Sequence, residues 1–407
     1  MTNKNNVEEL ALFGGAPLFE VPKPTSNLVR PDFEKFLGYS KVFFESHQYT
    51  NDGALVRLLE QRLATFHQTE FCISFCSGFW ALALAISVLA RPGRSEIILP
   101  SFTYRRMADI AAWCKLKPHF CEVEVGTLTS SAASVRPCIN DNTALILGVH
   151  PIVNLCDIDG LVDLAKEQNI PLLFDSVESL YETSAGRKIG CFGAAEIFSL
   201  GASKLVNGYE GGYLTTNDAH LAEKLALMRG FGFKGPDHIV VSGGINAKLN
   251  EIHAAMALAC LDDLDDQVLR NRELYLTYKH FLAPLKGIRL LKFDESCRPG
   301  YKNIVIEILD DWPVSRADTV NILNAEMILA RAYYTPPLHR RHLAYPHVPV
   351  ALPLTDHLAE RFILLPCGYF VSNEDVAKIV GLLSFISANA KEIKVRLHQQ
   401  RVVHECY

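Results

Sequence analysis

The sequence predicts an α/β fold in which a mainly parallel sheet is covered by helices on both faces, followed by a smaller α+β domain. Three observations lead to this prediction. Apolar strands alternate with helical segments over the first two thirds of the chain. These strands are apolar at consecutive positions, which is typical of strands buried on both faces. The chain also has 407 residues, more than one hydrophobic core usually serves, so two domains are expected.

The elements of the first domain follow from short apolar runs. The longest run, at 79–90 (FWALALAISVLA), predicts a buried helix, because it is shorter than the ~18–20 residues needed to cross a bilayer. No membrane segment is therefore indicated. A second helix is expected at 160–169, where apolar residues recur at helical spacing. The predicted strands are 96–100, 119–124, 144–150, 170–175, 195–200 and 211–218.

A change of pattern marks the second domain, which we place at 266–407, after a first domain at 1–265. A long helical segment at 250–285, expected to contain a break, joins the two. The elements expected beyond it are a strand at 303–309, a helix near 315–327 and an amphipathic helix at 373–393.

Composition narrows the class of protein. Apolar residues make up 49% and charged residues 21%, which fits a well-packed soluble enzyme. The net charge is −5 and no basic block is interleaved with aromatics, which argues against a nucleic-acid-binding protein. The eleven cysteines are scattered, and Cys72 and Cys76 are interpreted as buried thiols. With no zinc-knuckle spacing and no signal peptide, reduced thiols and a cytoplasmic location are expected.

Lys204 stands in an unusual setting. It follows the strand at 195–200 in SLGASKLVNGYEGG, a run of small residues and glycines, where burying an amine is costly unless it is bonded. Ligands of an open parallel sheet bind beyond the carboxyl ends of its strands. Asp175, Tyr104 and the pair Ser77-Gly78 are expected at that edge too. Each alone has an ordinary explanation, such as a helix cap or a solvent-facing lysine.

Together these groups supply what pyridoxal phosphate requires. Lys204 would provide the amine for a Schiff base, with a pKa lowered by desolvation, and Asp175 would keep the pyridine nitrogen protonated. The helix N-terminus at Ser77–Phe79 and the hydroxyl of Ser199 would hold the phosphate. The ring of Tyr104 would stack on the cofactor.

Several motifs occur in an order that belongs to a known family. They run from LALFGGAPLF (10–19) to YYTPPLHRRHLAY (333–345). The strongest are FDSVES (174–179), FSLGASK (198–204), YEGGYLTTND (209–218), LMRGFGF (227–233) and GGINAKLNEIHAAM (243–256). The sequence thereby resembles the DegT/DnrJ/StrS-type sugar aminotransferases, of the aspartate aminotransferase fold. The resemblance implies a pyridoxal-phosphate-dependent transferase of fold type I, whose large domain holds a seven-stranded, mainly parallel sheet.

The resemblance also implies roles for single residues. Lys204 matches the Schiff-base lysine, Asp175 the acid at the pyridine nitrogen, Tyr104 the aromatic that covers the ring, and Ser199 the phosphate-binding serine. Glu178 occupies the place where the family usually has Gln or His near the ring oxygen.

Two further regions are assigned from the same resemblance. Asn246 matches an asparagine that reaches the phosphate of the neighbouring subunit, which implies a homodimer with shared active sites. Tyr334 and His339 are expected to meet substrate, with a purely structural loop as the alternative. For Arg229 we favour a structural role over binding a carboxylate.

The implied reaction moves an amino group from glutamate or glutamine to a nucleotide-linked keto-deoxysugar. The presence of Lys204 argues against the dehydratase branch of the family, which replaces this lysine. Phe79 and Trp80 depart from the family pattern, which has a threonine after Ser-Gly; Glu178 adds a charge, and VHPIVNLCD (149–157) lacks the usual glycine. Two alternatives therefore stay open: a pyridoxal phosphate enzyme of natural-product assembly with altered substrate or chemistry, and a non-catalytic protein that binds the cofactor or a metabolite.

Overall fold

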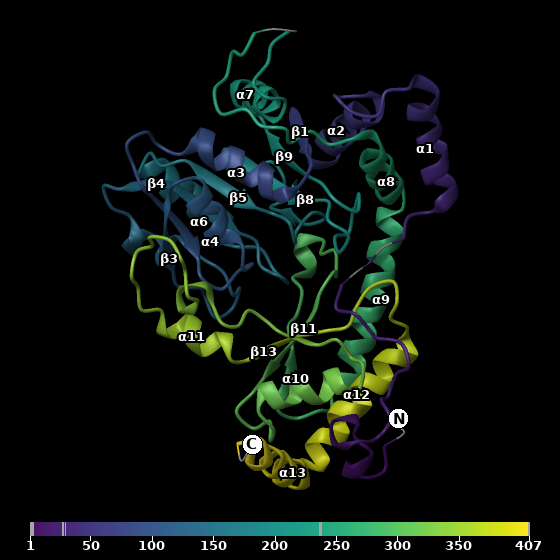
Figure 1. The fold of residues 1–407 in the computed structure, drawn as a ribbon. Helices are drawn as coiled ribbons and strands as arrows, with labels where there is room; N and C mark the ends of the chain where they lie inside the picture. The colour runs from purple at the N-terminus through teal and green to yellow at the C-terminus, as the bar shows by residue number, and fades with distance from the viewer. Residues whose placement is uncertain (1–3, 27, 29, 236–237, 406–407) are drawn as a thin grey trace.

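The computed structural model describes residues 4–26, 28, 30–235 and 238–405, and a seven-stranded sheet forms its upper half (Figure 1). The strand order is β1-β9-β8-β5-β4-β2-β3. Strands β2, β3, β4, β5 and β8 pair in parallel, whereas β9 is antiparallel to both of its neighbours. The predicted mainly parallel sheet is thus confirmed. The strands are β1 (Phe71–Phe75), β2 (Glu96–Pro100), β3 (Lys117–Cys121), β4 (Thr143–Val149), β5 (Leu172–Asp175), β8 (Ala195–Ser199) and β9 (Gly212–Thr216).

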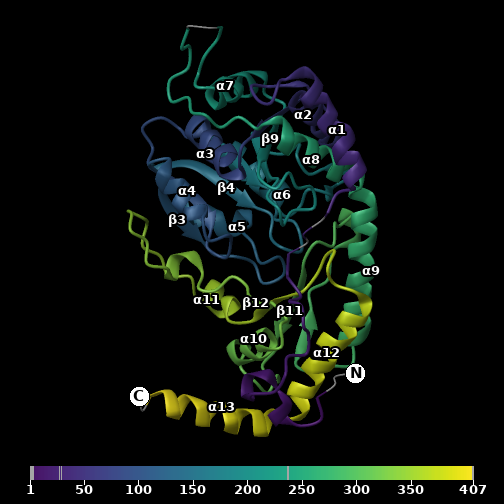
Figure 2. The ribbon, with the colours of Figure 1, turned by 45° about the vertical axis from the view of Figure 1, so that its right-hand side comes forward.

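Helices cover both faces of this sheet (Figures 1 and 2). One face carries α3 (Gly78–Leu89), α4 (Met107–Trp113) and α7 (Ala219–Arg229). The other carries α2 (Ala54–His67), α6 (Ile158–Glu167) and α8 (Glu251–Asp262), with α1 (Phe33–Ser46) outside α8. The apolar run 79–90 forms α3, whose residues from Ala81 to Ile86 are buried, and the Ser77 hydroxyl caps it by accepting the Trp80 amide.

The second part of the chain is built on an antiparallel sheet of order β10-β11-β13-β12. Its strands are β10 (Ile288–Leu290), β11 (Ile304–Ile308), β12 (Arg331–Ala332) and β13 (Phe362–Leu365). Its helices are α9 (Leu264–Leu282), α10 (Arg316–Ala325), α11 (Pro353–Ala359), α12 (Asn373–Ala388) and α13 (Ala390–Glu405). The expected break in the helix at 250–285 falls at Asp263, between α8 and α9. The proposed boundary between 265 and 266 lies in the first turn of α9 and stays a prediction.

The N-terminal segment packs against the second part of the chain, although the prediction counts it with the first domain (Figure 2). The Glu326 carboxylate accepts the backbone amides of Ala11 at 2.7 Å and Leu18 at 2.6 Å, and Lys23 pairs with Met327 through its backbone. Short elements complete the fold: η1 (Val7–Glu9), η2 (Ala11–Phe13), α5 (Ala132–Val135), η3 (Arg136–Cys138), β6 (Thr183–Ser184), β7 (Arg187–Lys188), η4 (Glu295–Cys297) and η5 (Leu338–Arg340).

Candidate active site

A cavity of about 930 Å³ lies at the carboxyl edge of the parallel strands, between the two sheets. The ends of β2, β4, β5 and β8 and the start of α3 line it from one side, and the segments around β11 and β12 line it from the other. Nine of the residues predicted for the site line this cavity: Ser77, Gly78, Phe79, Tyr104, Asp175, Glu178, Ser199, Lys204 and Tyr334.

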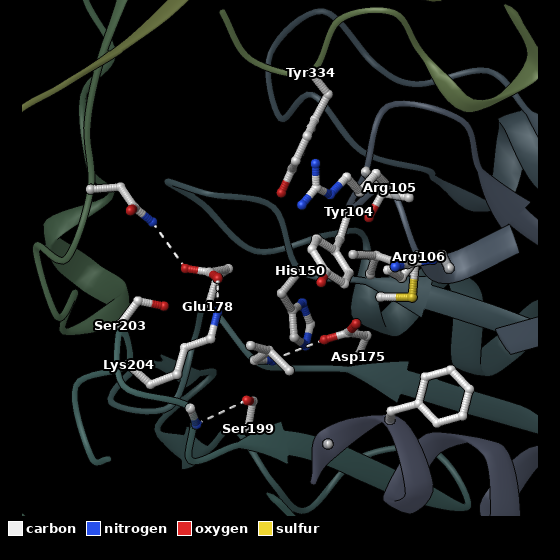
Figure 3. Close-up of a pocket in the computed structure, with 18 of the residues that line it drawn as sticks. Tyr104, Arg105, Arg106, His150, Asp175, Glu178, Ser199, Ser203, Lys204 and Tyr334 are labelled. Atoms are coloured by element: carbon white, nitrogen blue, oxygen red, sulfur yellow. Dashed lines mark hydrogen bonds and ion pairs between the residues drawn. The ribbon is translucent and has the colours of Figure 1, made fainter. Parts of the chain in front are cut away.

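Lys204 lies in the loop that joins β8 to β9. The loop is closed at its base by the Leu200 amide bonding to Gly211 and tightened by the Lys204 amide bonding to Gly201, both at 2.9 Å. The side chain points into the cavity, where its Nζ donates to Glu178 Oε1 at 2.6 Å (Figure 3). Burial acts to lower the pKa of Lys204, but the carboxylates of Glu178 and Asp175 outweigh it and raise that pKa. The predicted lowering of this pKa is therefore wrong for the protein without cofactor.

Asp175 ends β5 and is buried on the floor of the cavity. Its Oδ1 accepts the Val177 amide at 3.0 Å, and no hydrogen bond among the described residues involves its other oxygen. Burial raises the pKa of Asp175 to about 6. A cation placed on the free oxygen would hold this carboxyl in its charged form.

Glu178 is held by three nitrogen donors. Besides Lys204, the Lys302 ammonium and the Asn303 amide, the latter at 3.1 Å, donate to its Oε2. Burial alone would raise the pKa of Glu178, but the two lysines outweigh it and hold that pKa well below its usual value. The extra negative charge noted in the sequence is therefore matched by Lys302, a cavity residue that the sequence analysis missed. Burial lowers the pKa of Lys302 itself to about 8.

The first turn of α3 offers a place for a phosphate. The Ser77 hydroxyl caps the amide of Trp80, whereas the amides of Gly78 and Phe79 make no hydrogen bond among the described residues. Helix α3 begins directly against the end of β8, since a Cβ at Gly78 would lie 3.2 Å from the Cβ of Ser199. The free amides of Gly78 and Phe79 thus lie close to Ser199 at the N-terminus of a helix, an arrangement that suits an anion.

Aromatic rings line the upper part of the cavity. Tyr104 is half-exposed in the loop after β2, and Tyr334 lines the same cavity (Figure 3). The Tyr334 hydroxyl accepts a hydrogen bond from the Tyr333 hydroxyl. His150, which the sequence analysis did not assign, is buried and stacks on Phe174 with ring centroids 5.3 Å apart. Burial lowers the pKa of His150 to about 3, so its ring is neutral, and its Nε2 has no hydrogen-bond partner among the described residues.

Some predicted residues lie elsewhere. His339 is not part of the cavity lining; its ring bonds to Ser101 and pairs with Asp356, and its predicted contact with substrate stays a prediction. Arg229 is buried against Glu60 and the Ser74 carbonyl, which agrees with the structural role favoured for it.

Two more residues lie outside this lining. Trp80 points away and packs on Trp113 with ring centroids 4.9 Å apart, so of the two aromatic departures only Phe79 meets the cavity. Asn246 is exposed and does not line the cavity of its own chain. Its predicted contact needs a second copy and stays a prediction.

Two other classes of site can be considered in the part of the chain that the structure describes. No group of three or more His, Cys, Asp or Glu side chains is arranged there to hold a metal ion. None of the helices described has the length and apolar character needed to cross a bilayer.

Comparison with known proteins decides the family. A profile of the DegT/DnrJ/EryC1/StrS aminotransferase family matches residues 33–384. The chain belongs to this family. Among its relatives, the dTDP-4-amino-4,6-dideoxy-D-glucose transaminase of Shigella dysenteriae is 25% identical over 366 residues, which cover 89% of this chain and 97% of that protein. The GDP-perosamine synthase of Caulobacter vibrioides is 26% identical over 337 residues, covering 81% and 90%.

A solved structure of the same kind supports the fold over nearly the whole chain. The structure of DesI in the presence of its TDP-sugar product superposes with a TM-score of 0.90 and 30% identity, and the match covers 97% of this chain and 100% of that one. The family and the fold thus agree with the resemblance seen in the motifs. The chain is an aminotransferase-family enzyme, and the prediction of a non-catalytic protein finds no support.

Proposed function

We propose that this enzyme uses pyridoxal 5′-phosphate to transfer an amino group from glutamate or glutamine to a nucleotide-linked keto-deoxysugar. One observation carries the proposal. The amine of Lys204 points into a cavity that is also lined by the buried Asp175 carboxylate and by the start of α3, where two backbone amides are free. An amine, an acid and an anion site are the three groups that this cofactor needs.

The residues present fit the cofactor. When bound, pyridoxal phosphate supplies an aldehyde that takes up the amino group and a protonated ring that draws electrons from the carbon losing its proton. The amides of Gly78 and Phe79 and the hydroxyl of Ser199 would bind the phosphate. The free oxygen of Asp175 would hold the proton of the ring nitrogen, and Tyr104 would cover the ring.

Lys204 has two tasks in this proposal. Its Nζ would anchor the cofactor and, when an incoming amine leaves it free, would act as the base that accepts the proton of the donor's α-carbon. Glu178, whose Oε1 lies 2.6 Å from Nζ, would orient the amine and favour its charged form. Because Lys302 also contacts Glu178, the carboxylate keeps a cationic partner when the Lys204 amine is engaged.

The substrate class rests on the relatives. The names of the two enzymes and of the solved structure refer to dTDP-, GDP- and TDP-linked sugars, so the sugar nucleotide is common to them while the base differs. We therefore propose a nucleotide-linked keto-deoxysugar as the amino acceptor and leave the base open.

The proposal is tested with the purified protein loaded with pyridoxal phosphate. Adding glutamate, and glutamine separately, should shift the visible absorbance of the cofactor to that of its amine form and release the 2-oxo acid of the donor. Lys204→Ala should abolish both signals. Lys224→Ala, which removes an exposed lysine on α7, is the matched control and should change neither. A wild-type protein that binds the cofactor but yields no 2-oxo acid from either donor would contradict the proposal.

One observation favours a second candidate function. Phe79 lines the cavity next to the proposed phosphate site, where the family resemblance expects a threonine. A pyridoxal phosphate enzyme of natural-product assembly with altered chemistry would bind the cofactor through Lys204 but fail the donor test above. The two candidates are therefore separated by the release of the donor's 2-oxo acid.

We also propose that the enzyme acts as a homodimer. Large apolar side chains are exposed along α1 and the turn after it: Phe33 at 66%, Phe44 at 63% and Tyr49 at 51%. Such exposed apolar side chains are typical of a protein interface. Sedimentation should give twice the chain mass, and Phe44→Glu should reduce it to the monomer; a wild-type monomer would contradict the proposal.

A further inference from the structure

A second cavity, of about 590 Å³, opens beside the active site, and four of the eight residues that line it are arginines. We call it the arginine cavity; its lining is Arg105, Arg106, Asp109, Pro336, Arg340, Arg341, His342 and Leu343. Three of these, Arg105, Arg106 and Arg341, also line the active-site cavity. The two cavities therefore meet at these arginines.

Two loops from different parts of the chain bring the arginines together. Arg105 and Arg106 lie between β2 and α4, and Arg340 and Arg341 lie at the end of η5. Ser101 joins the two loops through two hydrogen bonds. Its carbonyl oxygen accepts from the Leu338 backbone amide and its hydroxyl oxygen accepts from the His339 backbone amide, each at 3.0 Å. Because both hydrogen bonds are made by the first two residues of η5, they hold Arg340 and Arg341 close to the β2–α4 loop.

Two of the four arginines are already paired. Arg106 bonds to Asp109 at 2.9 Å, and Asp109 also accepts the Tyr345 hydroxyl at 2.8 Å. Arg340 forms a forked pair with Asp356.

Arg105 and Arg341 are not paired in this way. Among the described residues, no acidic side chain pairs with either of them, and the buried Nε of Arg341 has no hydrogen-bond partner. Two guanidinium groups therefore face the junction of the cavities without an anion, although the chain as a whole carries a net charge of −5. A buried donor without an acceptor is costly, so an anionic ligand at this place would be stabilised.

We propose that the arginine cavity binds the diphosphate that links the nucleotide to the sugar, with Arg105 and Arg341 as its principal donors. Guanidinium groups match phosphate oxygens through forked hydrogen bonds, and two of them suit two adjacent phosphates. Arg105, Tyr104, Tyr334 and Lys204 line one cavity, and in the view of Figure 3 Arg105 is drawn above Tyr104 and Lys204 below it. A diphosphate at the arginines would leave the space between them and Lys204 for the sugar. This inference rests on the proposed function, whose acceptor it locates.

Binding without turnover tests the inference. The protein is saturated with pyridoxal phosphate, so that the phosphate site at α3 is filled, and is titrated calorimetrically with dTDP, GDP, inorganic pyrophosphate and thymidine. The variants are Arg105→Ala and Arg341→Ala. The matched control is Arg91→Ala, which removes an arginine just beyond the opposite end of α3.

We expect pyrophosphate and at least one diphosphate nucleotide to bind more tightly than thymidine, with an affinity that falls as salt rises. Each arginine variant should weaken the diphosphate by about tenfold or more, as the loss of a charge-assisted hydrogen bond predicts. Arg91→Ala should weaken it less than twofold. Equal affinities in all variants, or no binding of any diphosphate, would overturn the inference.

A further experiment distinguishes binding of the diphosphate at the arginines from binding of the amino donor, whose carboxylates are also anions. The rate at which glutamate alone converts the bound cofactor is therefore measured in wild type and in Arg341→Ala, beside the affinity of each protein for dTDP. If that variant lost the glutamate reaction and kept its affinity for dTDP, the arginines would hold the donor and the inference would be wrong. Failure of the proposed function has a different signature: the wild type would release no 2-oxo acid, whatever its affinity for dTDP.

Discussion

Lys302→Met would test how the cavity tolerates an additional carboxylate. Lys302 and Lys204 both form ion pairs with Glu178, and all three line the cavity. Methionine preserves most of the length of the lysine side chain and removes its charge. The companion change is Glu178→Gln, which restores a neutral side chain at a place where the resemblance expects one.

The size of the effect follows from the burial of the pair. The side chains of Lys302 and Glu178 are exposed by 8% and 16%. Two unit charges about 4 Å apart attract by about 4 kcal/mol at an effective dielectric constant of about 20. Burial opposes this attraction, as the lowering of the pKa of Lys302 to about 8 shows. Removing one partner of a buried pair typically costs about 3–5 kcal/mol; because Lys204 and Asn303 still contact Glu178, we expect about 2–3 kcal/mol.

A double-mutant cycle measures the interaction. Urea unfolding of the wild type, Lys302→Met, Glu178→Gln and the double variant should give a coupling free energy of about 2 kcal/mol, with the double variant more stable than Lys302→Met. Cofactor absorbance in the same four proteins shows whether the cavity keeps its function. If the two single effects simply add to within about 0.5 kcal/mol, Lys302 does not compensate for Glu178 and the reasoning is refuted.

Three other variants probe different parts of the account. Asp175→Asn should lower the rate of amine transfer by about 10²–10⁴-fold while the cofactor still binds, as rate and absorbance measurements would show. Gly212→Ala places a Cβ 2.4 Å from the Gly78 nitrogen, so it should lower the free energy of unfolding by about 1–3 kcal/mol and weaken cofactor binding. Gly230→Ala, whose Cβ would meet no atom nearer than 3.8 Å, is the control and should change neither quantity. Burial raises the pKa of Glu182 from 4.5 to about 7, so the wild type loses stability as pH rises between these values. Glu182→Gln should therefore be more stable than the wild type at pH 8, by about 3 kcal/mol at most, with little difference at pH 4; an equal difference at both would contradict this.

Local sequence patterns predicted much of the fold and part of the site. Strands such as 172–175 and 195–199 are apolar at consecutive positions because both of their faces are covered, and this pattern can be recognised without knowing what covers them. Asp175 ends one such strand and Lys204 lies in the loop after the other, so the edge of the sheet to which they belong could be inferred. Ser77 could be placed at a helix N-terminus because it directly precedes a long apolar run that forms α3.

The rest depends on contacts between distant segments. Lys302 reaches Glu178 across 124 positions of sequence and acts with Lys204 to keep Glu178 charged. The pKa of Lys204 is raised by this carboxylate and by Asp175, and the sequence does not show that the three side chains meet. The unpaired state of Arg341 could not be inferred either, because it depends on which acids the neighbouring arginines have already engaged. The contact of the N-terminal segment with the second part of the chain could not be inferred for the same reason, since its partner Glu326 lies more than 300 residues away.

The most direct test asks which lysine of the cavity carries the cofactor. Lys204 and Lys302 both contact Glu178, and the lower pKa of Lys302 makes it a genuine competitor as a nucleophile. Reducing the pyridoxal-phosphate-loaded protein with borohydride, digesting it and locating the modified peptide by mass spectrometry gives the answer. We predict the modification on Lys204; finding it on Lys302, or on neither lysine, would contradict the account.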